Sequence, residues 1–223
     1  MKAVVLVKNG AAASAFEIRE VPKPQPTADE VLIKVAAFGL NFADVMARNG
    51  MYKEAPPLPA VLGYDVAGII ESVGENVGHF NIGDRVVGMT RFGGYAEYAV
   101  TNAAAVTVIP ANLSMADATA LATQYCTAYF AAAEMMQLHK GDKVLVQSGA
   151  GGVGTALIQF AKYKECEIFS TAGSDAKLDY LKSLGVQHPI NYNTQDFEAI
   201  IKRETAGKGV DAIFDAVGGG SIN

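Results

Sequence analysis

Three glycines, Gly149, Gly151 and Gly154, form the pattern G-x-G-x-x-G and could hold the phosphates of a dinucleotide. An apolar run, 144–146, precedes them, and a predicted helix follows up to Tyr163. The first glycine would permit a tight turn, the second a close approach of the backbone to a pyrophosphate, and the third close packing of helix on strand. The helix N-terminus would then bind the phosphates, although a purely structural turn is the alternative. The predicted cofactor-binding residues of this turn are Gly149, Gly151, Gly152, Val153 and Gly154.

The end of the next predicted strand bears on which nicotinamide cofactor is used. NAD sites commonly place a carboxylate there, but residues 168–174 contain none. Ser174 and Lys177 follow instead, and a lysine in the first turn of a helix opposes the helix dipole by about 0.3–1 kcal/mol. The pattern therefore predicts NADPH rather than NADH, with Lys177 beside the 2′-phosphate. The alternative is a solvated lysine whose charge is offset by Asp175 and Asp179.

A second group of polar residues surrounds a short helical segment within a β-rich region. Asn41 can cap the N–H groups that follow it, and Asp44 occupies the third helical position, as in a capping box. Asn49 and Gly50 are typical of a helix end. Capping alone would explain Asn41 and Asp44, so these side chains have a structural as well as a chemical interpretation.

Composition and charge exclude several functional classes. The chain has 223 residues, of which 50% are hydrophobic and 18% charged, so it can bury a proper core. A net charge of −5 with no basic run argues against nucleic acid as the main partner. The most apolar helix candidate, 118–133, contains polar residues and is shorter than the roughly 20 residues that span a bilayer. We expect no membrane span, no signal peptide and a cytoplasmic location.

The two cysteines, Cys126 and Cys166, form no motif and favour a reducing compartment. Both are interpreted as small core residues, although Cys126, beside Thr127, could also line a site. No His, Lys or Arg neighbours Cys126 in the sequence to activate its thiol, which favours an inert side chain. The cysteines and the three histidines lack metal-ligand spacing, so no metal is expected.

Residues 1 to about 112 have the pattern of an all-β domain. Short runs rich in Val and Ile are separated by turn residues. The predicted strands are 2–7, 16–21, 31–37, 66–73, 85–88, 95–100 and 106–109. This pattern suggests a barrel or a bent, Greek-key-like sheet.

The periodicity changes at Ser114, which caps a helix predicted to reach about Leu138. Strands and helices then alternate, which is typical of a doubly wound parallel sheet and gives an α/β fold class. The predicted elements are a strand at 143–146, a helix to 163, a strand at 166–170, a helix from Ser174 to Gly185, a short strand near 189–190, a helix from the cap Asn193 to about 205 and a strand at 210–214. The strand order 3-2-1-4 would leave the apolar fourth strand at an edge, where we expect further chain or a partner to cover it.

Seven strings of residues, together with the order of β-barrel, long helix and Rossmann half, carry a family resemblance. They are GLNFAD (39–44), LGYDVAG (62–68), GDRV (83–86), GGYAE (93–97), TAY (127–129), the stretch 141–154 and DAVGG (215–219). The chain resembles the zinc-independent quinone oxidoreductase group of the medium-chain dehydrogenase/reductase superfamily, including its vesicle-protein branch. The resemblance implies a GroES-like β-barrel catalytic domain over 1–113. It also implies a Rossmann nucleotide-binding domain over 114–223 that lacks the last strands of the family pattern.

The resemblance further implies functional residues. Zinc-dependent relatives would need a Cys where Asn41 stands and a His where Tyr64 stands, so no zinc is implied. The implied catalytic residues, which face the nicotinamide, are Asn41, Asp44, Tyr52 and Thr127. The implied cofactor-binding residues beyond the glycine turn are Ser174, Lys177, Tyr192 and Val217.

The implied reaction is hydride transfer from NADPH to a quinone or an α,β-unsaturated carbonyl acceptor. Tyr52 could polarise the acceptor carbonyl by a hydrogen bond or donate a proton, and water is an equal candidate. Tyr52 can instead be a simple loop aromatic, and Thr127 a packing residue. The competing hypotheses are a non-catalytic NADPH-binding or scaffold protein and an inactive fragment of the reductase. The full-length parent is expected to form a homodimer.

Overall fold

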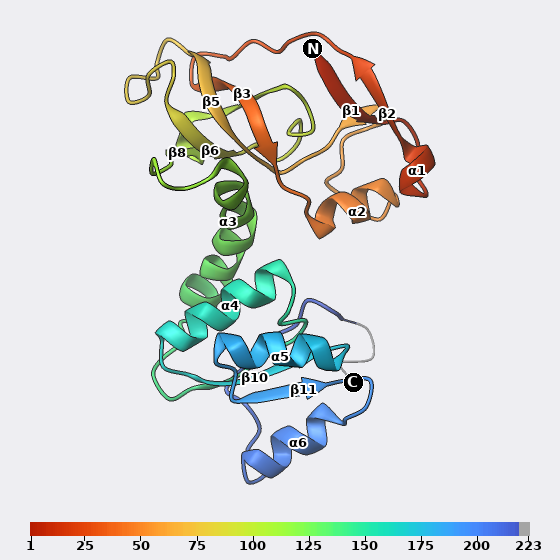
Figure 1. Ribbon diagram of the computed structural model, residues 1–223, viewed down its shortest axis with the longest axis vertical. Coiled ribbons are helices and arrows are strands. Elements are labelled where there is room, and N and C mark those ends of the chain that lie inside the picture. Colours follow the sequence, from red (N-terminus) through yellow and green to blue (C-terminus); the bar gives the residue numbers. More distant parts are fainter. Residues whose placement is uncertain (219–223) are drawn as a thin grey trace. The chain divides into compact units, whose positions relative to one another are not determined.

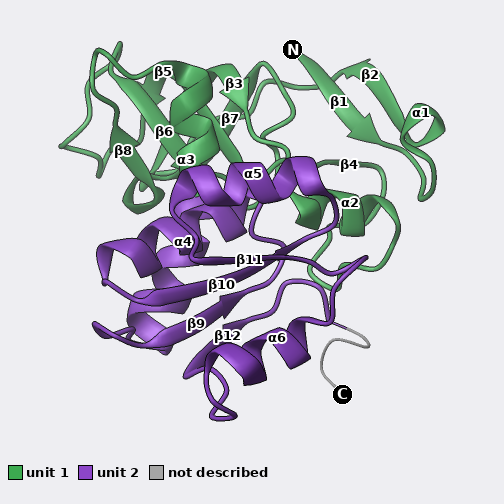
Figure 2. Ribbon diagram, turned by 60° about the horizontal axis from the view of Figure 1, so that its bottom comes forward, with its two compact units in different colours: residues 1–123 green, residues 124–223 purple. Residues whose placement is uncertain are grey.

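The structure is a computed structural model that describes residues 1–218, and the chain divides into two compact units (Figure 2). Unit 1 comprises residues 1–123, and unit 2 begins at Gln124. The division lies inside helix α3 (Met115–Tyr129). The sequence pattern places the domain change at Ser114, where the strands end, and the compact units divide ten residues later.

Unit 1 consists of two antiparallel sheets and short helices (Figure 1). Its strands are β1 (Lys2–Leu6), β2 (Phe16–Glu20), β3 (Glu30–Phe38), β4 (Ala60–Val61), β5 (Asp65–Val73), β6 (Arg85–Met89), β7 (Tyr98–Asn102) and β8 (Val106–Val108), and its helices are α1 (Ala12–Ala15), α2 (Phe42–Arg48), a 3-10 turn at Ala103–Ala105 and the start of α3. One sheet has the order β7-β3-β5-β6-β8, and the other has the order β2-β1-β4. Register shifts between β3 and β5 bend the larger sheet around a core that includes Ile33, Val66 and Ile70.

All seven strands predicted for this region are present. The largest difference is at β7, which begins at Tyr98 rather than Tyr95, because the N–H of Tyr95 donates to the carbonyl of Leu62 instead of joining the ladder. The sequence did not predict β4 or α1. A strand of two residues is too short to show the alternation by which strands are recognised.

Unit 2 is a parallel α/β sheet with helices on both faces (Figure 1). Its elements are β9 (Lys143–Val146), α4 (Gly152–Tyr163), β10 (Glu167–Ala172), α5 (Asp175–Leu184), β11 (His188–Asn191), α6 (Phe197–Glu204) and β12 (Ala212–Phe214). The strand order is β11-β10-β9-β12, which is the predicted order 3-2-1-4. Within the described residues β12 is an edge strand, as predicted. The α/β fold class, with a curled antiparallel part followed by a Rossmann-type sheet, is confirmed.

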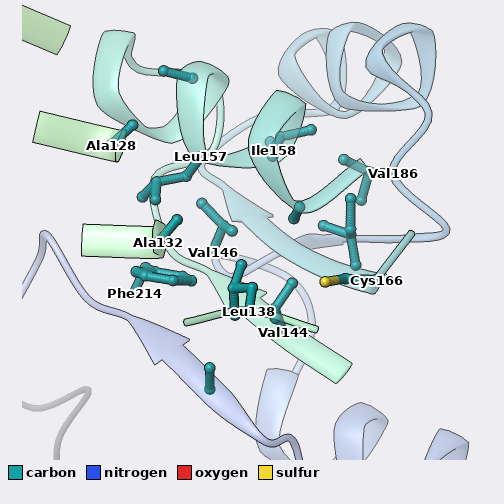
Figure 3. Packing of buried hydrophobic residues seen from close by; sticks show 14 of the residues in the cluster. Ala128, Ala132, Leu138, Val144, Val146, Leu157, Ile158, Cys166, Val186 and Phe214 are labelled. Atoms are coloured by element: carbon teal, nitrogen blue, oxygen red, sulfur yellow. The ribbon is translucent and has the colours of Figure 1, made fainter. Parts of the chain in front are cut away.

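The alternation of side chains along β9 explains why this sheet is covered on both faces. Val144 and Val146 pack with Leu157 of α4 (Figure 3). Leu145, between them, belongs to a separate cluster that includes Ile201 of α6. Because successive residues of a strand point to opposite faces, an uninterrupted apolar strand needs helices on both sides.

Helix ends differ from the prediction at two places. The α-helical part of α3 ends at Tyr129 and continues as a π-helical turn, Phe130–Met135, short of the predicted end at Leu138. The predicted cap of α6 is wrong. Asp196 caps that helix by accepting from the N–H of Ala199 over 3.0 Å, because it stands immediately before the helix. Across residues 1–218, no helix is long and apolar enough to cross a bilayer.

The two cysteines have different surroundings. Cys166 is buried, as predicted, and its Sγ donates to the carbonyl of His139 over 3.4 Å. Burial raises the pKa of the Cys166 thiol, and the charge of Asp142 raises it further. The prediction that Cys126 is a core residue is wrong, because it is exposed on α3. A single apolar-looking helix does not reveal from its sequence which of its sides faces solvent.

Candidate functional site

The N-terminus of α2 forms a polar cluster in unit 1. The carboxylate of Asp44, 5% exposed, accepts from the N–H of Asn41 over 3.0 Å and from the N–H of Gly63 over 3.1 Å. The side-chain Nδ2 of Asn41 donates to Oδ1 of Asp65 over 3.1 Å. The other oxygen of Asp65, which has no exposed surface, accepts from the N–H of Thr123 over 3.2 Å. Two predicted catalytic residues, Asn41 and Asp44, thus lie in one network, and the predicted capping box is present.

Tyr52, the third predicted catalytic residue of unit 1, lies against Tyr64. Their rings meet edge to face with centroids 6.2 Å apart, and the Tyr64 ring also contacts Phe92 at 5.2 Å. Burial raises the pKa of the Tyr64 phenol, hydrogen bonding to Tyr52 raises it further, and the negative charge of Asp44 adds to both. Tyr64 therefore keeps its proton at neutral pH. The structure brings Tyr52 into the neighbourhood of Asp44 through this second tyrosine.

Tyr95 also interacts with Asp44 and is 5% exposed. Its pKa is raised by burial first, then by the charge and hydrogen bonding of Asp44, and then by Asp65. Its ring packs on Phe38 with centroids 4.9 Å apart. A cavity of about 520 Å³ in unit 1 is lined by both rings and by Ile18, but by none of the predicted catalytic residues.

The glycine turn of unit 2 connects β9 to α4 and is held against the end of β10. The N–H of Gly149 donates to the carbonyl of Thr171 over 3.0 Å. A Cβ at Gly149 would lie 1.9 Å from Oγ of Ser170, and one at Gly154 would lie 2.4 Å from the carbonyl oxygen of Ser148. Neither position admits a side chain without a local shift. The close packing predicted for the third glycine is confirmed by the contact at Gly154.

The start of α4 is open to solvent. Gly151 is the N-cap residue and is exposed, as is Gly152, while Val153 is half-buried. The N–H groups of a first helical turn have no carbonyl partner within the helix, and the helix dipole gives that end a partial positive charge. An exposed end of this kind can bind an anion, in particular a phosphate.

Three further predicted cofactor-binding residues lie together where β10 and β11 end. Ser174 is the N-cap residue of α5, and its carbonyl accepts from the N–H of Lys177 over 3.1 Å. A Cβ at Gly173 would lie 2.6 Å from the hydroxyl of Tyr192, which places that phenol beside Ser174. Ser174 and Lys177 are exposed, and Tyr192 is 52% exposed. Lys177 follows Ser174 within the first turn of α5, so an ammonium and two hydroxyl groups come from neighbouring segments of the chain, and groups of these types suit a phosphate monoester.

The carboxylates that could offset the charge of Lys177 interact with other residues. Asp175 accepts from Nδ2 of Asn191 over 2.8 Å. Asp179 pairs with Lys182 at 3.0 Å. Each of the two carboxylates is thus bound to a residue other than Lys177.

Val217 lies in the loop that follows β12 and is 60% exposed. Its N–H and that of Gly218 donate to Oδ1 of Asp215 over 2.7 and 2.9 Å, which fixes a turn. Because β12 is parallel to β9 and pairs with it, this turn and the glycine turn follow the same edge of the sheet. The last glycine of the 215–219 string, Gly219, lies outside the described residues.

Thr127 is exposed on the part of α3 that belongs to unit 2. It therefore belongs to a different unit from Asn41, Asp44 and Tyr52, and the structure describes the two groups separately. Within residues 1–218, no group of three or more His, Cys, Asp or Glu side chains is placed to hold a metal ion.

Sequence reasoning did not identify Asp65 and Tyr64 as parts of this cluster. Asp65 begins strand β5, stands directly before the apolar run 66–70 and is fully buried. A carboxylate is almost never fully buried without partners, so a charge beside an apolar run is the signal that could have revealed it. Tyr64 stands out in the sequence only as the residue at the position of a ligand in zinc-dependent relatives.

Comparison with known families agrees with this division of the chain. The family described as "Alcohol dehydrogenase GroES-like domain" matches residues 27–111, and the family described as "Zinc-binding dehydrogenase" matches residues 152–223. The first match lies in unit 1 and the second in unit 2. The antiparallel part is therefore GroES-like, as predicted.

The proteins similar to this chain are longer than it is. The synaptic vesicle membrane protein VAT-1 homolog of Mus musculus is 40% identical over 205 residues, which are 92% of this chain and 50% of that protein. The structure of Escherichia coli quinone oxidoreductase complexed with NADPH has a TM-score of 0.94 at 29% identity and covers 100% of this chain and 68% of that one. The CurK enoyl reductase has a TM-score of 0.92 at 33% identity and covers 99% and 68%. The chain spans about half the length of the curated relatives it matches.

Proposed function

We propose that this chain, which belongs to the zinc-independent quinone oxidoreductase group of the medium-chain dehydrogenase/reductase superfamily, serves the NADPH-dependent reduction of a quinone or an α,β-unsaturated carbonyl compound. The observation that carries the proposal is the gathering of the glycine turn, Ser174, Lys177 and Tyr192 where parallel strands β9, β10 and β11 end. Ligands of doubly wound sheets bind at this edge. The solved relatives, an enoyl reductase and a quinone oxidoreductase with NADPH, support a reductase.

The residues of unit 2 fit NADPH. The exposed start of α4 suits a pyrophosphate, because Gly151 and Gly152 present backbone without side chains. Lys177, Ser174 and Tyr192 suit the 2′-phosphate, which distinguishes NADPH from NADH. When bound, NADPH would supply a hydride, that is, one proton with two electrons, to the acceptor.

The residues of unit 1 supply orientation and a proton. Reduction of the acceptor by a hydride leaves an oxyanion or enolate, which takes one proton. The hydroxyl of Tyr52 can give that proton and recover it from water, and a water molecule is the alternative donor. Asn41 and Asp44 fix the N-terminus of α2, and we propose that they hold the loop that leads to Tyr52 in place. Thr127 is proposed to contact the nicotinamide.

A second candidate function is binding of NADPH without turnover. One specific observation favours it: a 40% identical relative is described as a synaptic vesicle membrane protein. A scaffold role would keep the glycine turn and Lys177 and would need neither Tyr52 nor Asn41. An inactive fragment of the reductase is a third candidate, since the chain spans about half the length of its curated relatives.

Thermal unfolding with and without NADPH or NADH at matched concentrations tests the proposal first. Ligand at a hundred times its dissociation constant should add about 2.7 kcal/mol of stability. We expect a shift with NADPH and a much smaller one with NADH, followed by oxidation of NADPH when 1,4-benzoquinone or 2-cyclohexenone is added. Binding without oxidation of NADPH in both this chain and a full-length relative would select the scaffold function. No shift with either nucleotide would select the inactive fragment.

Three further features are proposed on family membership. Activity should survive treatment with a metal chelator, since the family group is zinc-independent. The full-length protein should form a homodimer, which sedimentation would show. A cytoplasmic location is consistent with the two free cysteines, and localisation of a tagged full-length protein tests it.

A further inference from the structure

Tyr64 occupies a position from which it can control Tyr52. It is the residue immediately before β5, and its carbonyl accepts from the N–H of Thr90 over 2.8 Å, so its backbone is fixed on both sides. Its ring is held between Phe92 and Tyr52, with centroid distances of 5.2 and 6.2 Å. Tyr52 lies in a loop, and its carbonyl accepts from the N–H of Ala55 over 3.0 Å. A fixed ring beside a loop residue can determine where that residue's hydroxyl points.

We propose that Tyr64 is a positioning residue: its hydroxyl donates a hydrogen bond to the oxygen of Tyr52 and so directs the proton of Tyr52 toward the acceptor. The inference rests on the proposed function and adds a residue to it. In this arrangement the Tyr52 oxygen accepts from Tyr64, and the Tyr52 O–H bond is the one that breaks when the reduced acceptor takes a proton. The Tyr64 hydrogen bond then stabilises the Tyr52 phenolate until water returns the proton.

The surroundings of Tyr64 support its role as the donor. Asp44 lies near Tyr64 and disfavours loss of its proton, while Arg91 acts in the opposite sense and is the weakest influence. Burial, hydrogen bonding to Tyr52 and the Asp44 charge together raise the pKa of Tyr64. Tyr64 is therefore suited to support Tyr52 rather than to replace it.

A double-mutant cycle on this chain tests the proposal. Tyr64→Phe keeps the ring and removes the hydroxyl, and Tyr52→Phe does the same at the partner. With NADPH and 1,4-benzoquinone, we expect Tyr64→Phe to lower kcat about fivefold, the effect of one neutral hydrogen bond, and to leave KM unchanged. In the Tyr52→Phe background the same substitution should change kcat less than about twofold, because its partner oxygen is gone. Tyr98→Phe, a tyrosine of β7 whose ring lies under Lys23, is the matched control and should leave kcat unchanged.

The proposal is overturned if Tyr64→Phe lowers kcat by the same factor in both backgrounds, or does not lower it at all. The same four proteins also give a cycle of urea unfolding, which needs no turnover. If the losses of unfolding free energy in the two single variants add up to the loss in the double variant, the two hydroxyls are not paired, and this holds even in an inactive chain. Suppose that the wild-type protein reduces neither benzoquinone nor 2-cyclohexenone, while the unfolding free energies of the variants are coupled. That result would overturn the proposed function and the catalytic use of the pair, but not the hydrogen bond between the two tyrosines.

Discussion

Asp65, which is completely buried, accepts a hydrogen bond from the side chain of Asn41 over 3.1 Å. The second Asp65 oxygen accepts from the N–H of Thr123 in α3. This one carboxylate thus joins the strand β5, the cap of α2 and the helix α3 within unit 1. A buried charge is tolerated only where hydrogen bonds satisfy it, so these two donors explain how a carboxylate can stand in this core.

Replacing Asp65 by Ala should destabilise the protein strongly. The substitution removes the acceptor of two hydrogen bonds, from Nδ2 of Asn41 and from the N–H of Thr123, and the loss of each bond to a buried carboxylate costs about 1–3 kcal/mol. Urea unfolding should therefore show a loss of about 2–6 kcal/mol. Asp29→Ala is the matched control, because Asp29 accepts from an asparagine, Asn76, over 2.8 Å on an exposed surface. That control should cost less than about 1 kcal/mol, and equal losses at the two sites would contradict the role assigned to Asp65.

A side chain at Gly154 should disrupt the nucleotide site. A Cβ there would lie 2.4 Å from the carbonyl oxygen of Ser148 and 2.7 Å from Cα of Gly149, so the backbone of the turn must move. We expect Gly154→Ala to cost about 1–3 kcal/mol, as overpacking of a close contact does, and to abolish the thermal shift with NADPH. Gly78→Ala, at a position with nothing within 4 Å, should keep both stability and the shift. A normal NADPH shift in Gly154→Ala would show that α4 need not approach the turn.

The parts of this architecture that local sequence determines could be predicted, and the parts that depend on distant contacts could not. The glycine turn and the strand order of unit 2 follow from a short motif and from regular alternation of strands and helices. The Asn41–Asp65 bond spans 24 residues, and the Asp65–Thr123 bond spans 58. Which residues meet across such separations is decided by the register and curvature of the sheet, which local periodicity does not encode. For the same reason Tyr52 could be named as a candidate from the sequence, but its contact with Tyr64 could not be predicted.

The wrong assignments have equally physical causes. Asn193 and Asp196 are both good N-cap residues, so the pattern allowed either, and the structure uses Asp196 for α6. Nδ2 of Asn193 instead donates to the carbonyl of Gly173 over 2.8 Å, near Tyr192. Cys126 was predicted to be buried because its helix is apolar, but exposure depends on what packs on each side, and at Cys126 the helix is open.

Stability on the acid side should depend on Glu167, at the start of β10. The hydrogen bond from Lys143 lowers the pKa of this carboxyl below its ordinary 4.5, with a smaller contribution from His188. A group whose pKa is lower in the folded state stabilises it above the unfolded pKa, and this contribution is lost as the pH falls below about 4.5 through the folded value. The side chain is a third exposed, so solvent limits the contribution to about 1 kcal/mol or less.

Glu167→Gln should accordingly flatten the dependence of the unfolding free energy on pH below 4.5, measured by urea unfolding at a series of pH values. Lys143→Met removes the hydrogen bond that lowers the pKa of Glu167 most. It should also flatten the pH dependence of the unfolding free energy, but to a smaller extent, because His188 still donates to the carboxylate. An unchanged acid-side slope in both variants would mean that the three side chains do not interact in solution.

Lys177 should determine the choice between NADPH and NADH. It is exposed in the first turn of α5, three residues after the N-cap residue Ser174, and the carboxylates nearest in sequence interact with other residues. A charge-assisted hydrogen bond to a 2′-phosphate is worth about 1.5–3 kcal/mol, so Lys177→Ala should weaken NADPH binding about 10- to 100-fold. NADH, which lacks that phosphate, should bind with unchanged affinity. Lys182→Ala, in the last turn of the same helix, removes an equal charge and should leave both affinities unchanged. Isothermal titration of the three proteins measures this, and an equal loss for NADPH and NADH in Lys177→Ala would show that the lysine stabilises the fold rather than recognising the phosphate.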